Sequence, residues 1–437
     1  MVRLGNWRVA LAALTLFTLL AGDAWRYLIG WIGWGALIAL LLAGWVTVAV
    51  RDRVDLRRLP IALGAWLAIV TVSIVWSHYP AASAIGIPTT LATAFGGVVM
   101  ALTLPLHEVA RALGIAVRWI LGLSLVFELA VAVFVGRPVL PLWVDYEGTV
   151  PLAFSWSRSL LFEGGRIQGI PGNANLLGLA ALIGVIVFAV QLADRRISRV
   201  SGIAWISAAV LVLLLTRSAT VLLAGVGVLV TLAVIIAARR LSGRGRAALY
   251  GSATVVSAAG VALVIAFREN ALDIVGRSSD LTGRSVIWER VVGLIDERPV
   301  AGWGWVSYWA PWVDPYDDLV IIDGVRYLQA HNAWLDVTLQ LGIIGLLAFS
   351  ALVLTTLVRV TSWSVDAPRD TRVPGTATTT ASADTAPPSA TLRLLPITLL
   401  ALLLVHSLAE SRLLIEAGLF LLVYLAVSSS QQLRTPA

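Results

Sequence analysis

The sequence predicts an all-α integral membrane protein with about 12 transmembrane helices and a large extracytoplasmic loop that contains surface helices. Hydrophobic residues make up 59% of the 437 residues, charged residues make up only 13%, and the mean hydropathy is +0.88. A soluble domain carries about 25% charged residues, because polar groups must cover its surface. An ordinary soluble enzyme of this length is therefore excluded.

Apolar runs near the roughly 20 residues that a helix needs to cross the hydrocarbon layer define the individual elements. The first run follows Arg3 and Arg8 and could be a signal peptide, but no cleavage site of small residues follows it, so we expect a retained helix. The predicted spans are 8–22, 27–50, 59–76, 84–106, 113–135, 173–192, 200–215, 219–238, 247–267, 338–358, 394–409 and 412–428.

The arginines predict the orientation of these helices. Outside two long loops they fall mostly on one side, and the exceptions are Arg26, Arg217 and Arg412. Arginine-rich loops stay in the cytoplasm, so we expect a multi-pass protein with both termini cytoplasmic. The net charge of +7 then reflects topology, and no nucleic-acid partner is expected. The chain has no lysine, which favours a GC-rich bacterial source and hence the bacterial cytoplasmic (inner) membrane.

These assignments divide the chain into seven segments. One of them contains residues 364–391, which are rich in Thr, Ala, Pro and Ser without apolar periodicity, and this composition predicts a disordered cytoplasmic linker. Separately, the absence of cysteine from the whole chain excludes disulfides, thiolate metal sites and cysteine nucleophiles. The segments are helices one to five (1–135), a first extracytoplasmic loop (136–171), helices six to nine (172–267), a large extracytoplasmic loop with the active-site elements (268–337), helix ten (338–358), the linker (359–393), and helices eleven and twelve with a tail (394–437).

The large loop holds six of the 18 tryptophans and begins with an amphipathic pattern. Apolar residues from Val286 to Ile295 recur at helical spacing, which predicts a helix at the membrane surface that ends before Pro299. Arg284 and Trp288 share one face of this helix. The alternative is an interfacial belt, in which arginine snorkels and tryptophan anchors. A tight turn follows, formed by Pro299, Gly302, Trp303, Gly304 and Trp305.

His331 and Asn332 directly precede the tenth span, at its outward end. Asn332 or a neighbour can therefore cap the helix. The positive end of the helix dipole disfavours an imidazolium, and a neutral imidazole can accept a hydroxyl proton as a general base. The alternative for His331 is a structural role.

Three arginines fall at one depth on the outer side of the membrane. Arg217 lies at the outward end of the seventh span, and Arg166 precedes a turn in which Asn173 and Asn175 can cap the sixth span and direct its free amides at an anion. Together with Arg284 they predict a diphosphate site, because guanidinium is permanently charged and binds phosphate oxygens with two prongs. The alternative is three separate surface arginines.

Other ionisable groups lie within or near the spans and in the large loop. His406 and Glu410 lie near the outward end of span eleven and Glu128 within span five, and such groups are functional candidates or structural partners of an arginine. An acidic patch in the large loop could hold a divalent cation, but its spacing favours a solvated face. This patch consists of Asp314, Asp317, Asp318 and Asp323.

Taken together, these motifs resemble the O-antigen ligase and polymerase family of bacterial membrane glycosyltransferases. The resemblance covers residues 166 to 345 by motif and the whole chain by its GT-C-like multi-span architecture. It departs from the family at Thr216-Arg217-Ser218, where the family usually has Ser-Arg-Gly or Ser-Arg-Ala. The motifs are Gly169 with Gly172-Asn173-Ala174-Asn175, then Thr216-Arg217-Ser218-Ala219, then Gly283-Arg284 with Trp288, Pro299, Gly302 and Gly304, and finally His331-Asn332 with Gly342 and Gly345.

The resemblance implies an inverting transferase that acts at the outer face of the membrane. Its donor would be a glycan on undecaprenyl diphosphate, its acceptor a hydroxyl of a lipid or glycan among the membrane lipids, and no metal or other cofactor is implied. Arg217 and Arg284 would bind the diphosphate and His331 would deprotonate or orient the acceptor. Arg166, Asn173 and Asn175 would assist at the diphosphate. Acceptor contacts or support would come from Asn332, Trp288, Trp303, Trp305 and Glu410.

Other functions remain open from the sequence. Polysaccharide polymerases and protein O-oligosaccharyltransferases share these motifs and differ in the acceptor. A transporter or lipid-glycan flippase of similar span number would place polar groups at the bilayer midplane, where Glu128 is the main feature in its favour. A structural scaffold would require none of the arginine and histidine placements.

Overall fold

The computed structural model describes residues 6–143, 150–266, 279–322, 324–366 and 388–432. Within these residues a helix lies at each of the twelve predicted spans, and a further helix, α11, lies in the large loop. The spanning positions are α1 (Asn6–Leu20), α2 (Gly22–Arg51), α3 (Ile61–Val72), α4 (Pro80–Thr103), α5 (Leu106–Ala130), α6 (Ala174–Ala193), α7 (Arg199–Thr216), α8 (Ala219–Ala238), α9 (Gly243–Ala266), α12 (Ala333–Val365), α13 (Leu394–Ser407) and α14 (Glu416–Gln432).

Length and hydropathy identify which described helices can cross a membrane. Seven are long and apolar enough, and three shorter ones, Trp7–Leu20, Ile61–Val75 and Leu394–Ser407, are also apolar. The predicted class, an all-α membrane protein, is confirmed. The remaining described elements are the 19-residue helix α11 (Ser279–Glu297) and several short ones. The short elements are the helical turns η1 (Leu56–Arg58), η2 (Ser73–Val75), η3 (Val131–Val135), η4 (Leu152–Phe154) and η5 (Ser411–Leu414), and an antiparallel pair of two-residue strands, β1 (Ile321–Ile322) and β2 (Val325–Arg326).

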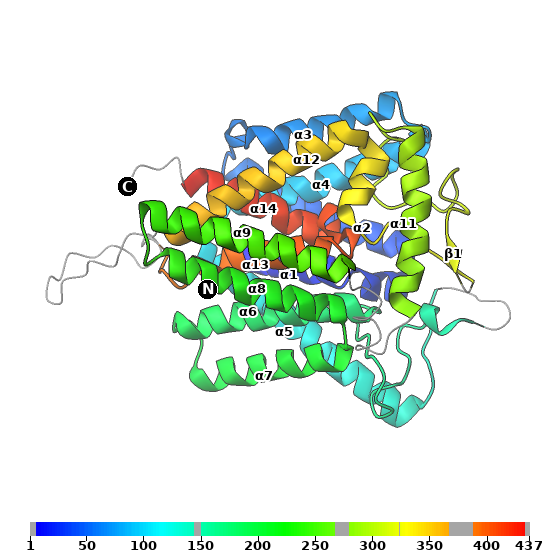
Figure 1. Ribbon diagram of the computed structural model, residues 1–437. Coiled ribbons are helices and arrows are strands. Elements are labelled where there is room, and N and C mark those ends of the chain that lie inside the picture. Colours follow the sequence, from blue (N-terminus) through cyan, green and yellow to red (C-terminus); the bar gives the residue numbers. More distant parts are fainter. Residues whose placement is uncertain (1–5, 144–149, 267–278, 323, 367–387, 433–437) are drawn as a thin grey trace, which may run out of the picture.

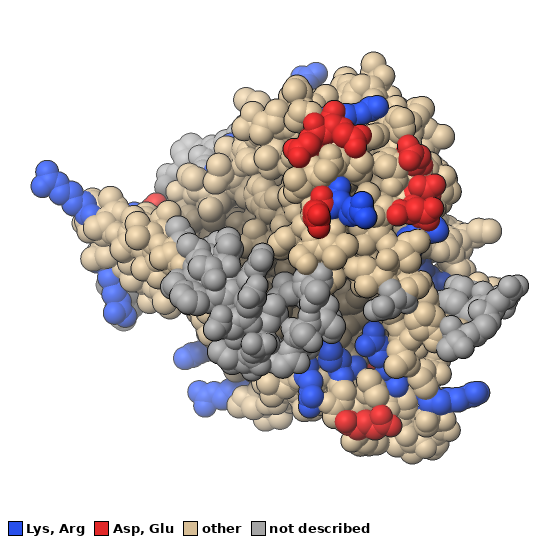
Figure 2. Space-filling model, turned by 45° about the vertical axis from the view of Figure 1, so that its right-hand side comes forward, with Lys and Arg blue, Asp and Glu red and all other residues tan. Residues whose placement is uncertain are grey.

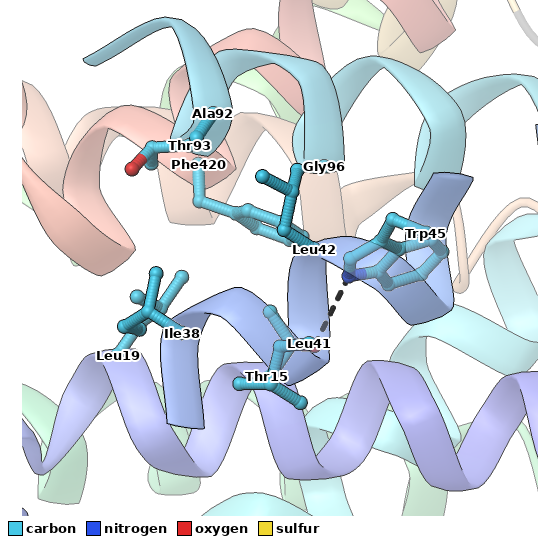
Figure 3. A pocket seen from close by; sticks show the side chains of 10 residues that line it. All are labelled: Thr15, Leu19, Ile38, Leu41, Leu42, Trp45, Ala92, Thr93, Gly96 and Phe420. Atoms are coloured by element: carbon cyan, nitrogen blue, oxygen red, sulfur yellow. Dashed lines mark hydrogen bonds between the residues drawn. The ribbon is translucent and has the colours of Figure 1, made fainter. Parts of the chain in front are cut away.

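Helix α14 forms the centre of the bundle (Figure 1). Its residues from Ala417 to Ser430 are buried all around, and it packs against α4 and α12. A helix that is apolar on every face is stable only inside a bundle, whereas helices such as α7 and α8 leave one side exposed. A small apolar cavity lies between α1, α2, α4 and α14, beside Phe420, where the Trp45 indole donates to the Thr15 hydroxyl at 3.1 Å (Figure 3).

Helix α12 bends at Gly342, which has a φ of 62° inside the helix. A Cβ at this position would lie 2.2 Å from the carbonyl oxygen of Val300, so only glycine lets the 299–304 turn cross the helix here. The amide of Ile343 donates to the carbonyl of Pro299 at 2.9 Å. The bend therefore separates a short N-terminal part of α12, which begins beside His331, from a longer C-terminal part.

The C-terminal part of α12 is longer than the sequence predicts. We expected the span to end at 358 and a linker to begin at 359, but the helix continues to Val365. Val360, Trp363 and Val365 are buried, and their burial against the bundle continues the helix beyond Arg359. Most of the predicted linker, residues 367–387, lies outside the described residues.

The elements that the sequence predicts to be extracytoplasmic gather at one end of the bundle, which we name the outer end after this prediction. Helix α11 forms where the amphipathic pattern predicts it and runs across the ends of the other helices, at the right of Figure 1. Its Ile287 and Val291 are fully buried in a second apolar cluster that also contains Trp303 and Trp309. In Figure 2 this end is turned toward the viewer, and arginine side chains border a recess below a group of acidic side chains.

Glu128 fixes the first outer loop to the bundle. It lies near the end of α5, is 1% exposed, and accepts hydrogen bonds from the Ser157 hydroxyl at 2.8 Å and from the amides of Gln168 and Gly169 at 2.9 and 2.7 Å. Three hydrogen-bond donors from one loop account for the burial of this carboxylate, so no transport role is needed to explain it. The main sequence feature in favour of a transporter therefore has a structural explanation.

Candidate functional site

Glu410 is the centre of a polar cluster at the outer end of the bundle. It lies between α13 and η5 and is 3% exposed. Its carboxylate accepts hydrogen bonds from His331 Nδ1 at 2.8 Å, Asn175 Nδ2 at 2.9 Å and Arg284 Nη2 at 3.2 Å. Gln329 Nε2 lies 3.4 Å away. The cluster therefore joins the α6 start, α11, the segment before α12 and the segment after α13.

The charge of Glu410 depends on these partners. Burial alone would raise the pKa of Glu410, but the positive charge that His331 carries when protonated, its hydrogen bond and the charge of Arg284 hold that pKa well below its usual range. Glu410 therefore stays ionised over the range in which carboxyl groups usually titrate. A fixed carboxylate of this kind can orient an imidazole.

His331 is held so that one ring nitrogen faces Glu410. The residue has a φ of 49°, in the left-handed region, and directly precedes Asn332, whose side chain caps α12 by accepting from the amides of Trp334 and Leu335 at 3.0 and 3.2 Å. Because the Glu410 carboxylate accepts at Nδ1, the ring proton belongs on Nδ1, and Nε2 of the neutral ring carries the lone pair. The side chain is 19% exposed. In its neutral form, His331 therefore has the tautomer that a general base requires.

Arg284 and Trp288 reach the cluster from the same face of α11, as their spacing predicts. Trp288 Nε1 donates to the carbonyl of Ala330 at 2.9 Å and so fixes the residue before His331. The Arg284 guanidinium donates through Nη2 to Glu410 and its side chain is 15% exposed. A guanidinium has five donors, and the described residues account for this one hydrogen bond, so Arg284 can also bind an anion.

The first outer loop supplies the other side of the cluster. Arg166 donates to Asn175 Oδ1 at 2.8 Å and to the carbonyl of Thr216 at 3.1 Å, and the Ser218 hydroxyl donates to the same Asn175 oxygen at 2.8 Å. Asn173 caps α6 through its side chain, which accepts from the amides of Asn175 and Leu176. Asn175 thus joins Arg166 to Glu410, and Arg166 and Arg284 belong to one hydrogen-bond network.

Arg217 lies at the edge of this network. It is exposed, has a φ of 46°, and ends α7 directly before Ser218. A Cβ at Gly164 would lie 3.6 Å from its Nη2, which places its guanidinium over the first outer loop. The structure thus connects Arg217 to the cluster through its neighbour Ser218.

Trp303 and Trp305 do not present an indole face to the outside. They are 6% and 0% exposed, and their indole nitrogens donate to the carbonyl of Leu294 at 2.8 Å and to the Thr90 hydroxyl at 2.9 Å. Because both rings are buried in apolar surroundings, they support the loop and cannot stack on a sugar. The acidic patch is dispersed: Asp314 contacts His78 at 3.2 Å, Asp318 contacts Arg326 at 3.6 Å, and Asp323 lies outside the described residues.

Two residues beside the cluster were not expected from the sequence. Asp336, one turn into α12, and Ser411, which follows Glu410, bond to each other. A weak signal for Asp336 was a carboxylate in the first turn of a predicted span. Ser411 offers no such signal, because its partner is 75 residues away.

A second charged cluster fixes η5, the turn that carries Ser411 and lies next to Glu410. Arg26 donates to Asp23 at 2.8 Å and to Glu416 at 2.7 Å, and Arg412 donates to Glu416 at 2.6 Å. Arg26 and Arg412 were expected on the outer side, and each is buried in an ion pair here. These pairs tie the α2 start to η5 and thereby restrict the position of Glu410.

Replacing Glu410 by glutamine is expected to lower the free energy of unfolding by about 1.5–3 kcal/mol at pH 7, because its charge-assisted hydrogen bonds are lost. Because the pKa of Glu410 is lower in the folded than in the unfolded protein, its ionised form stabilises the fold at any pH above the unfolded-state pKa. This stabilisation is lost as the pH falls from the unfolded-state pKa through the folded-state pKa. The difference in the free energy of unfolding between the parent and Glu410→Gln should therefore be constant above about pH 5 and shrink below the usual glutamate pKa of about 4. Thermal unfolding in detergent at several pH values measures it, and a difference that grows toward low pH would contradict this assignment.

Comparison with known proteins gives one finding for this region. Residues 202–350 match the family model described as O-antigen ligase. The matched range contains Arg217, Arg284 and His331, and no curated protein matches the chain.

Proposed function

Because residues 202–350 carry the O-antigen ligase family domain, we propose that this protein transfers a glycan from an undecaprenyl-diphosphate carrier to an acceptor hydroxyl. The reaction takes place at the outer face of the bacterial cytoplasmic membrane, inverts the anomeric carbon and requires no metal ion. The observation that carries the proposal is the contact of His331 with Glu410 beside Arg284.

In the proposed reaction, His331 acts as a general base on the acceptor hydroxyl. The acceptor hydroxyl oxygen attacks the anomeric carbon, and its proton passes to Nε2 of His331. The Glu410 carboxylate, 2.8 Å from Nδ1, stabilises the imidazolium that forms. At the same time the bond between the anomeric carbon and the diphosphate oxygen breaks, and the diphosphate leaves with the bonding electrons. A single displacement of this kind inverts the anomeric carbon.

The arginines act on the leaving group. As the bond to the diphosphate breaks, negative charge develops on its oxygens, and fixed cations in a water-poor site lower the barrier more than they could in bulk water. Arg284 is held in place by Glu410, and Arg166 by Asn175. With Arg217 they supply the charge that a divalent cation supplies in other transferases.

The acceptor distinguishes the members of this class. Lipid, glycan and protein hydroxyls are deprotonated by the same base, so ligase, polymerase and protein O-oligosaccharyltransferase share the proposed chemistry. The test supplies the purified protein with undecaprenyl-diphosphate glycan and each acceptor, with and without EDTA, and determines the anomeric configuration of the product. Transfer with inversion in EDTA supports the proposal. Loss of product in EDTA, or retention, overturns the metal-free or inverting assignment.

The side of the membrane is open to a clean labelling test, because the chain has no cysteine. We expect a cysteine introduced as Asp318→Cys, in the large loop, to react with an impermeant maleimide in intact cells. Ser242→Cys, in the turn between α8 and α9, should react only after permeabilisation. Both positions are exposed, so access to reagent is matched. The reverse pattern would place the His331 cluster in the cytoplasm and contradict a lipid-linked donor on the outer face.

A further inference from the structure

Asp336 links the two segments that carry His331 and Glu410. It lies in the first turn of α12 and is 2% exposed. Its Oδ1 accepts from Trp309 Nε1 at 2.8 Å, and its Oδ2 accepts from the amide of Ala330 at 3.1 Å and from the Ser411 hydroxyl. Three donors from three segments therefore meet at one buried carboxylate.

Two of these donors adjoin the pair. Ala330 immediately precedes His331, and Ser411 immediately follows Glu410, so one carboxylate oxygen holds both backbones from inside the helix end. His331 and Glu410 are 79 residues apart in the chain, and a further bond between their segments, from the Trp334 indole to the Ser407 hydroxyl at 3.1 Å, lies one turn away from the pair. The third donor, Trp309, is itself fixed, because its ring stacks on Tyr316 at 5.4 Å with an interplanar angle of 8°.

We propose that Asp336 is a positioning residue that sets the contact between His331 and Glu410 without touching substrate. This inference rests on the proposed function, since it assigns how the base of that reaction is oriented. A displacement of about 1 Å at a reacting group can cost on the order of 10²-fold in rate, so a residue that fixes both partners strongly affects catalysis.

The chemistry of the contacts explains why a carboxylate is needed. All three neighbours donate, and a carboxylate has acceptors on both oxygens. Asparagine has almost the same shape but presents an NH₂ group on one side. Whichever way the amide is turned, that group faces the Trp309 indole N–H or the Ala330 amide, and neither of these can accept a hydrogen bond. Asp336→Asn therefore breaks the link with little change in volume.

Several titratable groups surround the His331 imidazole, each from a different element. Glu410 faces it from the segment before η5, Asp336 from α12, and the Tyr327 ring packs edge-on against it at 5.7 Å. Arg284 approaches from α11 through Glu410, and His406 of α13 lies behind that carboxylate. In Asp336→Asn all of these except Asp336 itself remain in place, and Ser411→Ala, which removes a link but keeps every charge around the imidazole, separates the effect of position from that of the lost charge.

The experiment measures transfer by the purified full-length protein with undecaprenyl-diphosphate glycan. In Asp336→Asn we expect kcat to fall on the order of 10²-fold with the KM for donor nearly unchanged. In a His331→Ala background the same substitution should cause no further loss, because the residue acts through His331. Ser411→Ala removes a single link and should lower kcat by about tenfold. If Asp336→Asn fails to fold, Ser411→Ala alone and in the His331→Ala background decides the question.

The matched control is Gln340→Ala, which removes another buried polar side chain of α12. Gln340 Oε1 accepts from the amides of Val306 and Ser307 at 2.8 and 3.1 Å and does not touch the pair. We expect this variant to lose thermal stability while kcat stays near the parental value. Equal losses in Gln340→Ala and Asp336→Asn, or a further loss from Asp336→Asn in the His331→Ala background, overturn the positioning role. If the parent itself does not transfer glycan, the proposed function fails instead.

Discussion

Replacing His331 by alanine is expected to lower kcat for glycan transfer by about 10²–10⁴-fold, which is the usual contribution of a positioned general base. Donor binding should stay near the parental value, because the imidazole acts on the acceptor hydroxyl and the diphosphate is bound by arginines. Single-turnover transfer, with donor affinity measured separately, distinguishes the two steps.

The control for this variant is His78→Ala. His78 also lies at the outer end, where it contacts Asp314 at 3.2 Å, but it is 39% exposed and does not contact Glu410. We expect parental turnover in His78→Ala. Parental turnover in His331→Ala, with the protein folded, would remove His331 from the role of base.

Replacing Arg284 by glutamine is expected to lower kcat by about 10²–10³-fold, the cost of removing one fixed donor to a developing anion. Arg284→Lys should recover part of this loss, since lysine keeps the charge but lacks the two-pronged geometry. The measurement is turnover against donors with good and poor leaving groups. If Arg284 stabilises the departing diphosphate, the loss in Arg284→Gln should be smallest for the donor with the best leaving group.

A matched control for Arg284 is available on the same helix. Arg290 is exposed on α11, whereas Ile287 and Val291 of the same helix are buried. Arg290→Gln removes the same charge from the same element and should leave turnover near the parental value. Equal losses in both variants would show that Arg284 acts only through the general charge of the outer surface.

The sequence predicts the helices well because their signal is local. Each apolar run of sufficient length formed a helix, and α11 formed where a 3.6-residue pattern preceded Pro299. The predicted end of α12 was wrong because Val360 and Trp363 are buried by tertiary packing, which continues the helix past a charged residue. The bend at Gly342 was missed for a similar reason, since it depends on the approach of the Pro299 turn.

The candidate site is predictable only in part. The caps formed by Asn173 and Asn332 follow from local sequence, because a side chain that caps a helix bonds to residues two or three positions away. The partner of His331 does not follow, because Glu410 is 79 residues distant and reaches it only through the packing of α12 and α13. Trp303 and Trp305 were expected to be able to contact substrate, and the large loop instead buries them.

A double-mutant cycle on His331 and Glu410 tests the central claim most directly, namely that these two residues act as one base. Single-turnover transfer is compared in the parent, His331→Ala, Glu410→Gln and the double variant, each checked for folding. We predict that the double variant is about as slow as His331→Ala alone, because Glu410 acts through the imidazole. If instead the two single losses multiply in the double variant, the residues act independently and the claim is contradicted.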